Sequence, residues 1–218
     1  MDSSTPLADM RVRHMQCGLL EADCAACPFA QFGAWLRAAQ ENSPGEWFEV
    51  NAMNLATSTQ TGEVSARTVL LKGFDQSGLT FYTNYSSQKG RQLADNPVAA
   101  ATFFWPHLER QVRISGTVQK TSRQDSQSYF HSRPRESQLG AIASQQSAVL
   151  SGREELEALF NAAEKRYEGA QAPLPDSWGG YLLKPDQFEF WQGRIGRLHD
   201  RIRYRLADGA WVMERLAP

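Results

Sequence analysis

The stretch FEFWQGRIGRLHDR, residues 188–201, is the part of the sequence that decides the fold we expect. Phe188 and Phe190 alternate with Glu189 and Trp191, which is the period-two pattern of a β-strand. The glycines of the QGRIG segment predict a tight bend, and a second extended segment follows it. The stretch therefore predicts two consecutive strands near the C-terminus.

The second of these strands carries three basic side chains that we expect on one face. Arg197, His199 and Arg201 recur at every second residue, so they point to the same side of a regular strand. The arginines keep their charge, the imidazole titrates near neutral pH, and like charges in a row repel one another. The row is therefore either a solvated edge strand or a site for a phosphorylated or otherwise anionic ligand, with Trp191 nearby to pack on a ring.

The composition is that of an ordinary globular protein, with 218 residues, 41% of them hydrophobic and 22% charged. The length suits one large domain or two small ones. The formal net charge of -1 argues against nucleic acid as a partner. No apolar run approaches the roughly 20 residues that span a bilayer, and the N-terminal segment lacks the features of a signal peptide. We therefore expect a cytoplasmic protein with no membrane or nucleic-acid partner.

The three cysteines all lie near the N-terminus, at positions 17, 24 and 27. Cys24 and Cys27 have the spacing of a redox pair or of half a zinc site. No second pair of cysteines or histidines is spaced to complete a zinc site, and no strand is expected before the pair, as a redox motif requires. We therefore expect free thiols and no metal site.

The rest of the sequence predicts a mainly β protein with peripheral α-helices. Residues 1–27 lack clear periodicity and are expected to form a flexible arm, followed by a single domain over residues 28–218 with a helical insertion at about 122–170. Consecutive strands with short connections predict an antiparallel barrel or sandwich. We expect strands at residues 53–58, 64–74, 79–84, 98–105, 108–120, 181–183, 187–191, 197–206 and 211–216. We expect helices at residues 28–40, 86–93, 122–133, from 134 onward and at 153–167.

Basic side chains lie beside two of these elements. Arg67 and Lys72 flank a TVLL run, where they are either surface charges on an edge or cations that grip a phosphate at the two ends of a buried strand. Lys89 follows Ser87 at an expected helix N-terminus, where unpaired backbone N–H groups and the helix dipole favour an anion.

A third cluster lies at a corner between two helices. Tyr129, Arg133 and Ser137 recur at every fourth residue, but Pro134 breaks the helix between them. The spacing fits an ordinary helix corner and an anion site about equally well. The sequence contains no dinucleotide-binding glycine motif and no P-loop, and no serine or cysteine has an evident base. If the protein is an enzyme, a cofactor is therefore expected to carry the difficult step.

Taken in order from about residue 51 to the C-terminus, these segments resemble the pyridoxine/pyridoxamine 5'-phosphate oxidase family of FMN enzymes. The matching segments are RTVLLK (67–72), FYTN (81–84), NP (96–97), RQVR (110–113), YFHSRP (129–134), SQLGA (137–141), QQS (145–147), WGG (178–180), EFWQG (189–193), RLHDR (197–201) and RLAP (215–218). The resemblance implies an antiparallel FMN-binding split β-barrel that forms a homodimer with its active sites at the interface.

The resemblance also implies which residues bind the ligands. The implied FMN-binding residues are Arg67, Thr68, Val69, Leu70, Leu71, Lys72, Tyr82, Thr83, Gln88, Lys89, Gln111, Gln146, Ser147, Trp191 and Arg201. The implied substrate-binding residues are Lys72, Tyr129, Arg133, Ser137, Arg197, Leu198 and His199. Arg197 and His199 are implied as the catalytic pair, over the pyridine ring near the carbon that is oxidised.

The implied reaction converts pyridoxamine or pyridoxine 5'-phosphate to pyridoxal 5'-phosphate. The C4' carbon of the substrate gives a hydride to flavin N5, and O2 reoxidises the flavin with release of H2O2, while the amine substrate also releases NH3. FMN and the substrate each carry a phosphate, which accounts for two separate groups of cations. The predicted enzyme is therefore a pyridoxal 5'-phosphate synthase that takes part in vitamin B6 salvage or biosynthesis.

Two features depart from the family pattern. Gln88 stands where the family usually has a basic residue on the flavin phosphate, so FMN is expected to be held less tightly. The N-terminal arm lacks the family's basic and tyrosine-containing segment, so no residues that close over the substrate are carried over to it.

Two alternatives remain from the sequence. A related FMN oxidase of the phenazine-pathway type would act on another ring and would not need the phosphate pocket of Tyr129, Arg133 and Ser137. A non-catalytic FMN-binding or pyridoxal-phosphate-binding protein would be expected to lack Arg197 or His199, and both are present.

Overall fold

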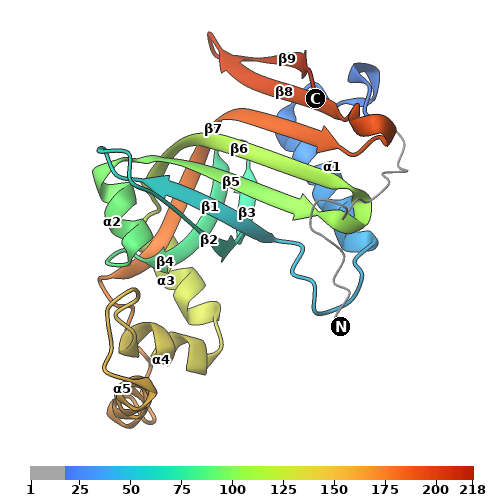
Figure 1. The fold of residues 1–218 in the computed structure, drawn as a ribbon. Helices are drawn as coiled ribbons and strands as arrows, with labels where there is room; N and C mark the ends of the chain where they lie inside the picture. Colours follow the sequence, from blue (N-terminus) through green and yellow to red (C-terminus); the bar gives the residue numbers. More distant parts are fainter. Residues whose placement is uncertain (1–17) are drawn as a thin grey trace, which may run out of the picture. The chain divides into compact units, whose positions relative to one another are not determined.

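The computed structural model describes residues 18–218 (Figure 1). Within them the chain divides into two compact units. Unit 1 holds residues 18–50, 102–114 and 187–218, and unit 2 holds residues 51–101 and 115–186. Residues 1–17 of the expected N-terminal arm lie outside the described part of the chain.

The described residues form a nine-stranded sheet together with α-helices and short 3-10 turns. The strands are β1 (Ala52–Ser58), β2 (Val64–Leu70), β3 (Gly73–Asp75), β4 (Gly78–Asn84), β5 (Val98–Trp105), β6 (Arg110–Lys120), β7 (Trp178–Gln192), β8 (Asp200–Ala207) and β9 (Ala210–Leu216). The helical segments are η2 (Glu21–Asp23), α1 (Pro28–Glu41), α2 (Gln88–Asp95), η3 (Pro106–Leu108), α3 (Arg123–Ser132), α4 (Arg135–Ala143), α5 (Arg153–Arg166) and η4 (Ile195–Arg197). No helix among the described residues is long and apolar enough to cross a bilayer.

The sheet is built mainly from antiparallel neighbours. In unit 2 its order is β2-β1-β5-β6-β7-β4-β3, and the pairs β1–β2, β3–β4 and β4–β7 are antiparallel. In unit 1, β8 pairs with the end of β7 and β9 pairs with β8, again antiparallel (Figure 1). Strands β5, β6 and β7 pass through both units. The predicted mainly β, antiparallel architecture is confirmed.

The core of unit 1 is aromatic. Helix α1 begins at Pro28, which suits a first helical turn, and it buries an apolar face at helical spacing. Trp35 of that face meets Phe190 of β7 edge to face, with ring centroids 5.2 Å apart. Phe188 and Phe190 are fully buried, as their alternation predicted. Glu189 is buried as well, which alternation alone did not predict.

Unit 2 has a core cluster under its helices. The cluster contains Phe130 of α3, Leu139 of α4 and Trp178 at the start of β7. Ser122 begins α3 by accepting a hydrogen bond from the Asp125 N–H, as an N-cap residue should. The remaining cluster residues are Ala143, Ala163 and Ala172.

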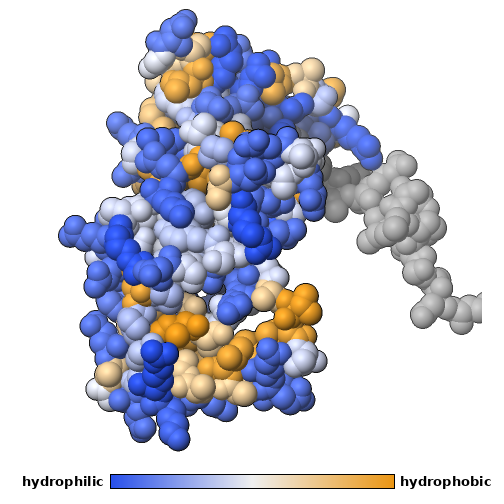
Figure 2. Space-filling view, turned by 90° about the vertical axis from the view of Figure 1, so that its left-hand side faces the viewer, coloured by the Kyte–Doolittle hydropathy of each residue, from blue (hydrophilic) through white to orange (hydrophobic). Residues whose placement is uncertain are grey.

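Some apolar residues of unit 2 remain at the surface. Figure 2 shows such surface gathered around a hollow in the lower part of the view. Val149 and Leu150, in the loop before α5, and Leu159 of α5 are all exposed. Ala163 is the buried residue of α5.

Three strand boundaries differ from the sequence prediction. The strand expected over residues 64–74 is divided, because the Leu71 N–H donates to the Asn51 carbonyl while the Lys72 N–H donates to the Thr80 carbonyl. The two strands expected at 181–183 and 187–191 form one strand, β7, which continues through Pro185.

The third difference concerns the predicted row of basic residues. Gly196 and Arg197 both have positive φ values, 71° and 61°, and β8 begins only at Asp200. The prediction that Arg197, His199 and Arg201 share one face of a strand is therefore wrong, since only Arg201 lies in β8. An arginine in the left-handed region is uncommon and costs backbone energy, so the surrounding turn holds it there.

Candidate active site

A cavity of about 660 Å³ lies within unit 2. Its volume falls in the range of about 300–1,000 Å³ that is usual for small-molecule sites. The cavity brings together residues predicted to bind the cofactor and residues predicted to bind the substrate. It is lined by Thr68, Val69, Leu70, Lys72, Tyr82, Thr83, Asn84, Lys89, Tyr129, Arg133, Pro134, Ser137, Gly140, Ala141, Ser144, Gln146 and Trp178.

Lys89 is the buried cation of this cavity. Ser87 caps α2 by accepting a hydrogen bond from the Gly90 N–H, which places Lys89 in the first turn of the helix. The Lys89 ammonium donates to Thr83 Oγ1 at 3.2 Å and to Gln146 Oε1 at 2.9 Å. Burial and the nearby charge of Arg67 lower the pKa of Lys89 to about 8. A bound anion would favour the charged form of Lys89 and raise this pKa.

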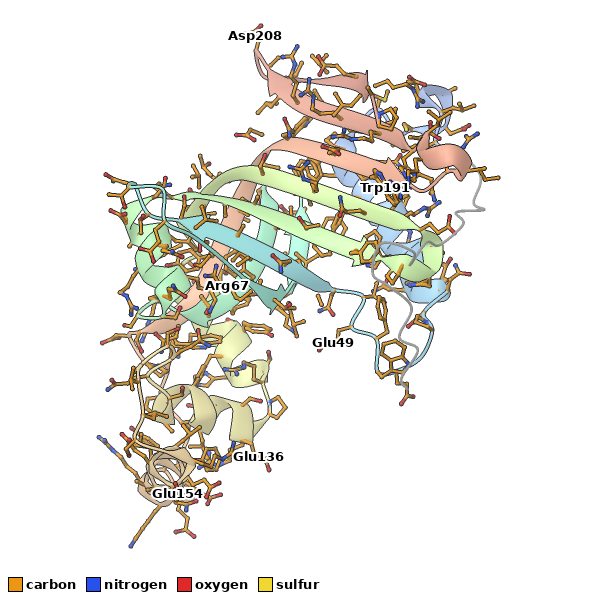
Figure 3. All side chains as sticks on the ribbon, in the orientation of Figure 1. Glu49, Arg67, Glu136, Glu154, Trp191 and Asp208 are labelled. Atoms are coloured by element: carbon orange, nitrogen blue, oxygen red, sulfur yellow. The ribbon has the colours of Figure 1, made fainter. Side chains whose placement is uncertain are left out.

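Arg67 lies on β2 (Figure 3). It is not among the residues that line the cavity. Its guanidinium donates to the Leu55 carbonyl at 3.1 Å, to Thr57 Oγ1 at 2.6 Å and to Ser65 Oγ. These acceptors are neutral, so they fix the side chain without cancelling its charge. Partial burial lowers the pKa of Arg67.

Arg133 is another of the three cations that line the cavity, with Lys72 and Lys89. It follows α3, and its Cζ lies 4.8 Å from the centroid of the Trp178 ring. One guanidinium nitrogen, Nη1, is buried and has no hydrogen-bond partner among the described residues. Burial also lowers the pKa of Arg133. An orphaned buried donor on a cation is unfavourable unless a ligand accepts from it.

The QQS loop closes one side of the Lys89 environment. Gln146 lines the cavity and accepts hydrogen bonds from Thr83 Oγ1 and from Lys89. Ser147 has a φ of 72°, and its hydroxyl accepts from the Gln88 N–H at 3.2 Å. The side chains of Gln88, Ser147 and the buried Leu71 do not line the cavity.

The other predicted site residues lie in unit 1. They are Gln111 on β6, Trp191 at the end of β7 (Figure 3), Arg201 on β8, and Arg197, Leu198 and His199 in the turn between these two strands. Trp191 pairs with Arg201 across β7 and β8. The ring centroids of His199 and Trp191 are 4.7 Å apart.

His199 is held in one tautomer by its backbone neighbour. Its Nδ1 accepts a hydrogen bond from the Arg194 N–H at 3.0 Å, so the proton of the neutral ring lies on Nε2. Arg197, in the same turn, is exposed.

The structure adds residues that the sequence prediction missed. Trp178 and Asn84 line the cavity, and both fall in segments that carry the family resemblance, although neither residue was given a role. In unit 1, Glu189 Oε1 accepts from Arg201 at 2.9 Å and Oε2 accepts from Arg113 at 3.1 Å. The alternation of residues 188–191 placed Glu189 on the same side of the strand as Trp191, and this could have identified Glu189 as a residue near the predicted site.

The two described cysteines take no part in this cavity. Cys24 and Cys27 are free thiols, and Cys24 donates weakly to the Leu20 carbonyl. Burial raises the pKa of Cys24, which leaves it a poor nucleophile at neutral pH. Cys17 lies outside the described residues.

The sequence matches two family models that together cover most of the chain. Residues 30–170 match the model described as pyridoxamine 5'-phosphate oxidase. Residues 178–218 match the pyridoxine 5'-phosphate oxidase C-terminal dimerisation region.

Curated relatives are similar over nearly the whole length. A pyridoxine/pyridoxamine 5'-phosphate oxidase of Rhodopirellula baltica is 51% identical over 213 residues, which is 96% of this chain and 95% of the relative. An enzyme of the same name from Pseudomonas putida is 52% identical over 212 residues, covering 97% of this chain and 98% of the relative.

Two solved structures are similar in fold. PhzG from Burkholderia lata 383, in complex with tetrahydrophenazine-1-carboxylic acid, has a TM-score of 0.85 and 29% identity, and the match covers 92% of this chain and 98% of that one. A pyridoxamine 5'-phosphate oxidase-related, FMN binding protein from Nostoc punctiforme has a TM-score of 0.67 and 19% identity, covering 85% and 96%. This second likeness shows the fold alone. The fold is the split β-barrel that the sequence predicted.

Proposed function

The chain belongs to the pyridoxine/pyridoxamine 5'-phosphate oxidase family, and from that premise we propose that it oxidises pyridoxamine or pyridoxine 5'-phosphate to pyridoxal 5'-phosphate. FMN is the proposed cofactor and O2 the proposed acceptor, with release of H2O2 and, from the amine, NH3. The observation that carries the proposal is the unit 2 cavity, which Lys89 and Arg133 line together without a carboxylate between them.

The donor chemistry of this cavity fits FMN. Lys89 in the first turn of α2 offers a buried positive charge and suits the phosphate. Tyr82 and Val69 offer ring and apolar surface on the same cavity. A bound FMN would supply the two-electron acceptor for the substrate and would be reoxidised by O2.

The second set of lining residues suits the phosphate of the substrate. Arg133 offers the orphaned Nη1 donor, and Lys72 and Ser137 line the same cavity. A guanidinium binds a phosphate through two parallel hydrogen bonds, which fixes orientation as well as position. The task of these residues is to hold the ring in a reactive geometry, an effect that can lower a barrier by roughly 7–11 kcal/mol.

Arg197 and His199 are the proposed catalytic residues. Arg197 would hold the pyridine ring and stabilise negative charge that develops on it. His199, with its proton on Nε2, would orient the amine or hydroxyl of the substrate or move its proton. Both roles come from the family resemblance, and the tautomer of His199 supports the second.

We also propose that the protein is a homodimer. The match of residues 178–218 to the family's dimerisation region supports this, and unit 1 contains those residues from position 187 onward. Sedimentation of the purified protein should give the mass of two 24.4 kDa chains, and the mass of one chain would contradict the proposal.

One assay tests the function. The purified protein should show a flavin absorption spectrum after incubation with FMN, and it should produce H2O2 with pyridoxamine or pyridoxine 5'-phosphate. A protein that binds FMN and leaves both substrates unchanged would refute the proposed reaction. A protein that takes up no FMN would refute the proposed cofactor as well.

The second candidate is an oxidase for another ring, and the likeness to PhzG favours it. The two candidate functions differ in whether the Arg133 guanidinium binds a substrate phosphate. An oxidase for a phosphate-free ring should be insensitive to loss of that guanidinium, whereas Arg133→Leu should raise KM for pyridoxamine 5'-phosphate at least about 10-fold.

A further inference from the structure

Three aromatic rings of unit 2 form a nearly parallel stack beside the cavity. The ring planes of Tyr82 and Tyr129 lie within 18° of each other, with centroids 3.9 Å apart. Trp178 lies beside this pair and nearly parallel to both rings, at 12° and 5.6 Å from Tyr82 and at 6° and 6.2 Å from Tyr129. All three rings line the cavity. The three rings come from three separate elements, β4, α3 and β7.

Arg133 lies against the Trp178 ring of this group. Its Cζ is 4.8 Å from the Trp178 centroid and 6.0 Å from that of Phe130, so the indole is the nearer partner. Phe130 in turn packs edge-on against Trp178, with centroids 5.3 Å apart. The indole is 6% exposed and is held from several sides. It therefore offers the guanidinium a fixed surface.

An indole face holds a cation differently from a carboxylate. It attracts the guanidinium through its ring charge distribution, and it accepts none of the five N–H donors. A carboxylate would occupy two of those donors and cancel the charge. If the indole orients the guanidinium without accepting hydrogen bonds from it, some of its N–H donors stay unpaired. The buried Nη1 of Arg133, which has no partner among the described residues, fits this expectation.

We propose that Trp178 is a positioning residue that orients Arg133 for the phosphate group of the substrate, so that Trp178 sets the preference for a phosphorylated over an unphosphorylated ring. This inference rests on the proposed function, because it takes Arg133 as the residue that receives the substrate phosphate. It adds a residue to which neither the sequence motifs nor the family resemblance gave a role.

The test compares Trp178→Leu with wild type, both loaded with FMN. Dissociation constants for pyridoxal 5'-phosphate and for pyridoxal are measured by absorbance titration, and KM and kcat are measured with pyridoxamine 5'-phosphate. Loss of a desolvated cation–π contact predicts a Kd for the phosphorylated ligand that is about 5- to 30-fold higher. The Kd for pyridoxal should change less than about twofold, KM should rise with the first Kd, and kcat should change little.

A shape-preserving variant keeps the test valid if the leucine variant does not fold. Tetrafluorotryptophan placed at position 178 keeps the indole outline and withdraws charge from the ring face. It should raise the Kd of the phosphorylated ligand at least about threefold and leave the melting temperature unchanged. Trp178→Phe, which retains a weaker aromatic face, should fall between wild type and Trp178→Leu.

Phe81→Leu is the matched control. Phe81 is fully buried in the same unit and stacks on Tyr181 at 5.6 Å, but it does not line the cavity. Its loss should lower the melting temperature without a phosphate-specific change in Kd.

Two outcomes would overturn the inference: an equal loss of affinity for both ligands in Trp178→Leu, or an unchanged Kd in the fluorinated protein. If wild type binds pyridoxal 5'-phosphate more tightly than pyridoxal but oxidises neither vitamer, the proposed reaction fails and the titrations still decide the role of Trp178.

Discussion

Most arginines of β6–β9 in unit 1 and the cations of the unit 2 cavity are held in opposite ways, although Arg110 of β6 is held by the Gln192 amide and the Trp35 ring. In unit 1, Arg113 and Arg201 share the buried carboxylate of Glu189. In unit 2, Lys89 is held by a hydroxyl and an amide oxygen, and Arg133 by the face of a tryptophan. The first arrangement neutralises charge within the chain, and the second leaves the charge available.

Other ion pairs of unit 1 follow the same rule. Arg203 and Arg205 both pair with Glu214, at 2.6 and 3.1 Å. Arg215 pairs with Glu21 and Asp200 and so ties residues near position 20 to β9. The comparison leads us to expect that a basic residue with no carboxylate partner among the described residues is the better candidate for binding a ligand. Counting basic residues in the sequence cannot make that distinction.

Arg197 gives the largest expected effect and tests the rule from within unit 1, because the described residues supply it no ion pair. We expect Arg197→Ala to lower kcat about 1,000-fold, the range for loss of a group that stabilises developing charge. The Kd for FMN, followed by flavin fluorescence, should stay within about twofold. Arg205→Ala, which removes a partner of Glu214, is the control and should leave kcat unchanged. An equal loss of FMN binding in Arg197→Ala would place the residue on the cofactor instead.

Lys89 tests the rule from within the cavity. Lys89→Met should raise the Kd for FMN about 100-fold, because a buried charge-assisted hydrogen bond to phosphate is lost. The ligand-free variant should melt no lower than wild type, because a buried cation without a carboxylate does not stabilise the fold. Lys120→Met removes an exposed ammonium that lies over the Tyr85 ring and should leave the Kd unchanged. A marked fall in melting temperature for Lys89→Met would show that the lysine is structural.

Glu189 should contribute to the stability of the fold, whereas Lys89 should not. Glu189→Gln should lower the free energy of unfolding by about 2 kcal/mol, since Arg113 and Arg201 lose their shared carboxylate and both are partly exposed. Urea unfolding followed by tryptophan fluorescence measures the change. Glu157→Gln, in an exposed pair with Arg153, should produce no measurable change. Equal changes in the free energy of unfolding for Glu189→Gln and Glu157→Gln would contradict the distinction between the buried and the exposed ion pair.

The smallest expected effect is a pH dependence. Burial lowers the pKa of Lys89 to about 8 from 10.5, so the ligand-free protein loses this charge as the pH rises through 8. The affinity for FMN should therefore fall about fivefold between pH 8 and pH 9, and binding near pH 8 should take up protons. The free energy of unfolding of ligand-free protein should rise with pH from about 8 toward 10.5, because the unfolded state then binds more protons. Lys89→Met should lack both dependences.

Local sequence signals predicted much of the fold. Proline at the start of α1 and serine caps before α2 and α3 placed those helices to within about two residues. The alternation of residues 188–191 found the end of β7 and its buried phenylalanines. Each of these signals acts between residues that are close in the chain, which is why spacing alone reveals it.

The missed features depend on contacts between distant residues. The break at Leu71 and Lys72 arises because neighbouring backbone groups bond to residues 51 and 80. Trp178 meets Arg133 only through the fold, since 45 positions separate them. The left-handed backbone of Arg197 is likewise set by its turn and not by its residue type. The sequence predicted the cation groups of the cavity, while the roles of individual site residues stay predictions.

Strand β7 has a consequence for engineering. It is continuous from Trp178 to Gln192, pairs with β4 at one end and with β8 at the other, and carries Trp178 and Glu189 in different units. Inserting or deleting one residue between those positions would force one of the two pairings to slip, and every side chain in that half would turn to the opposite face. Chimeras between relatives should therefore be joined in the connections outside this strand, and its length should be kept in any redesign.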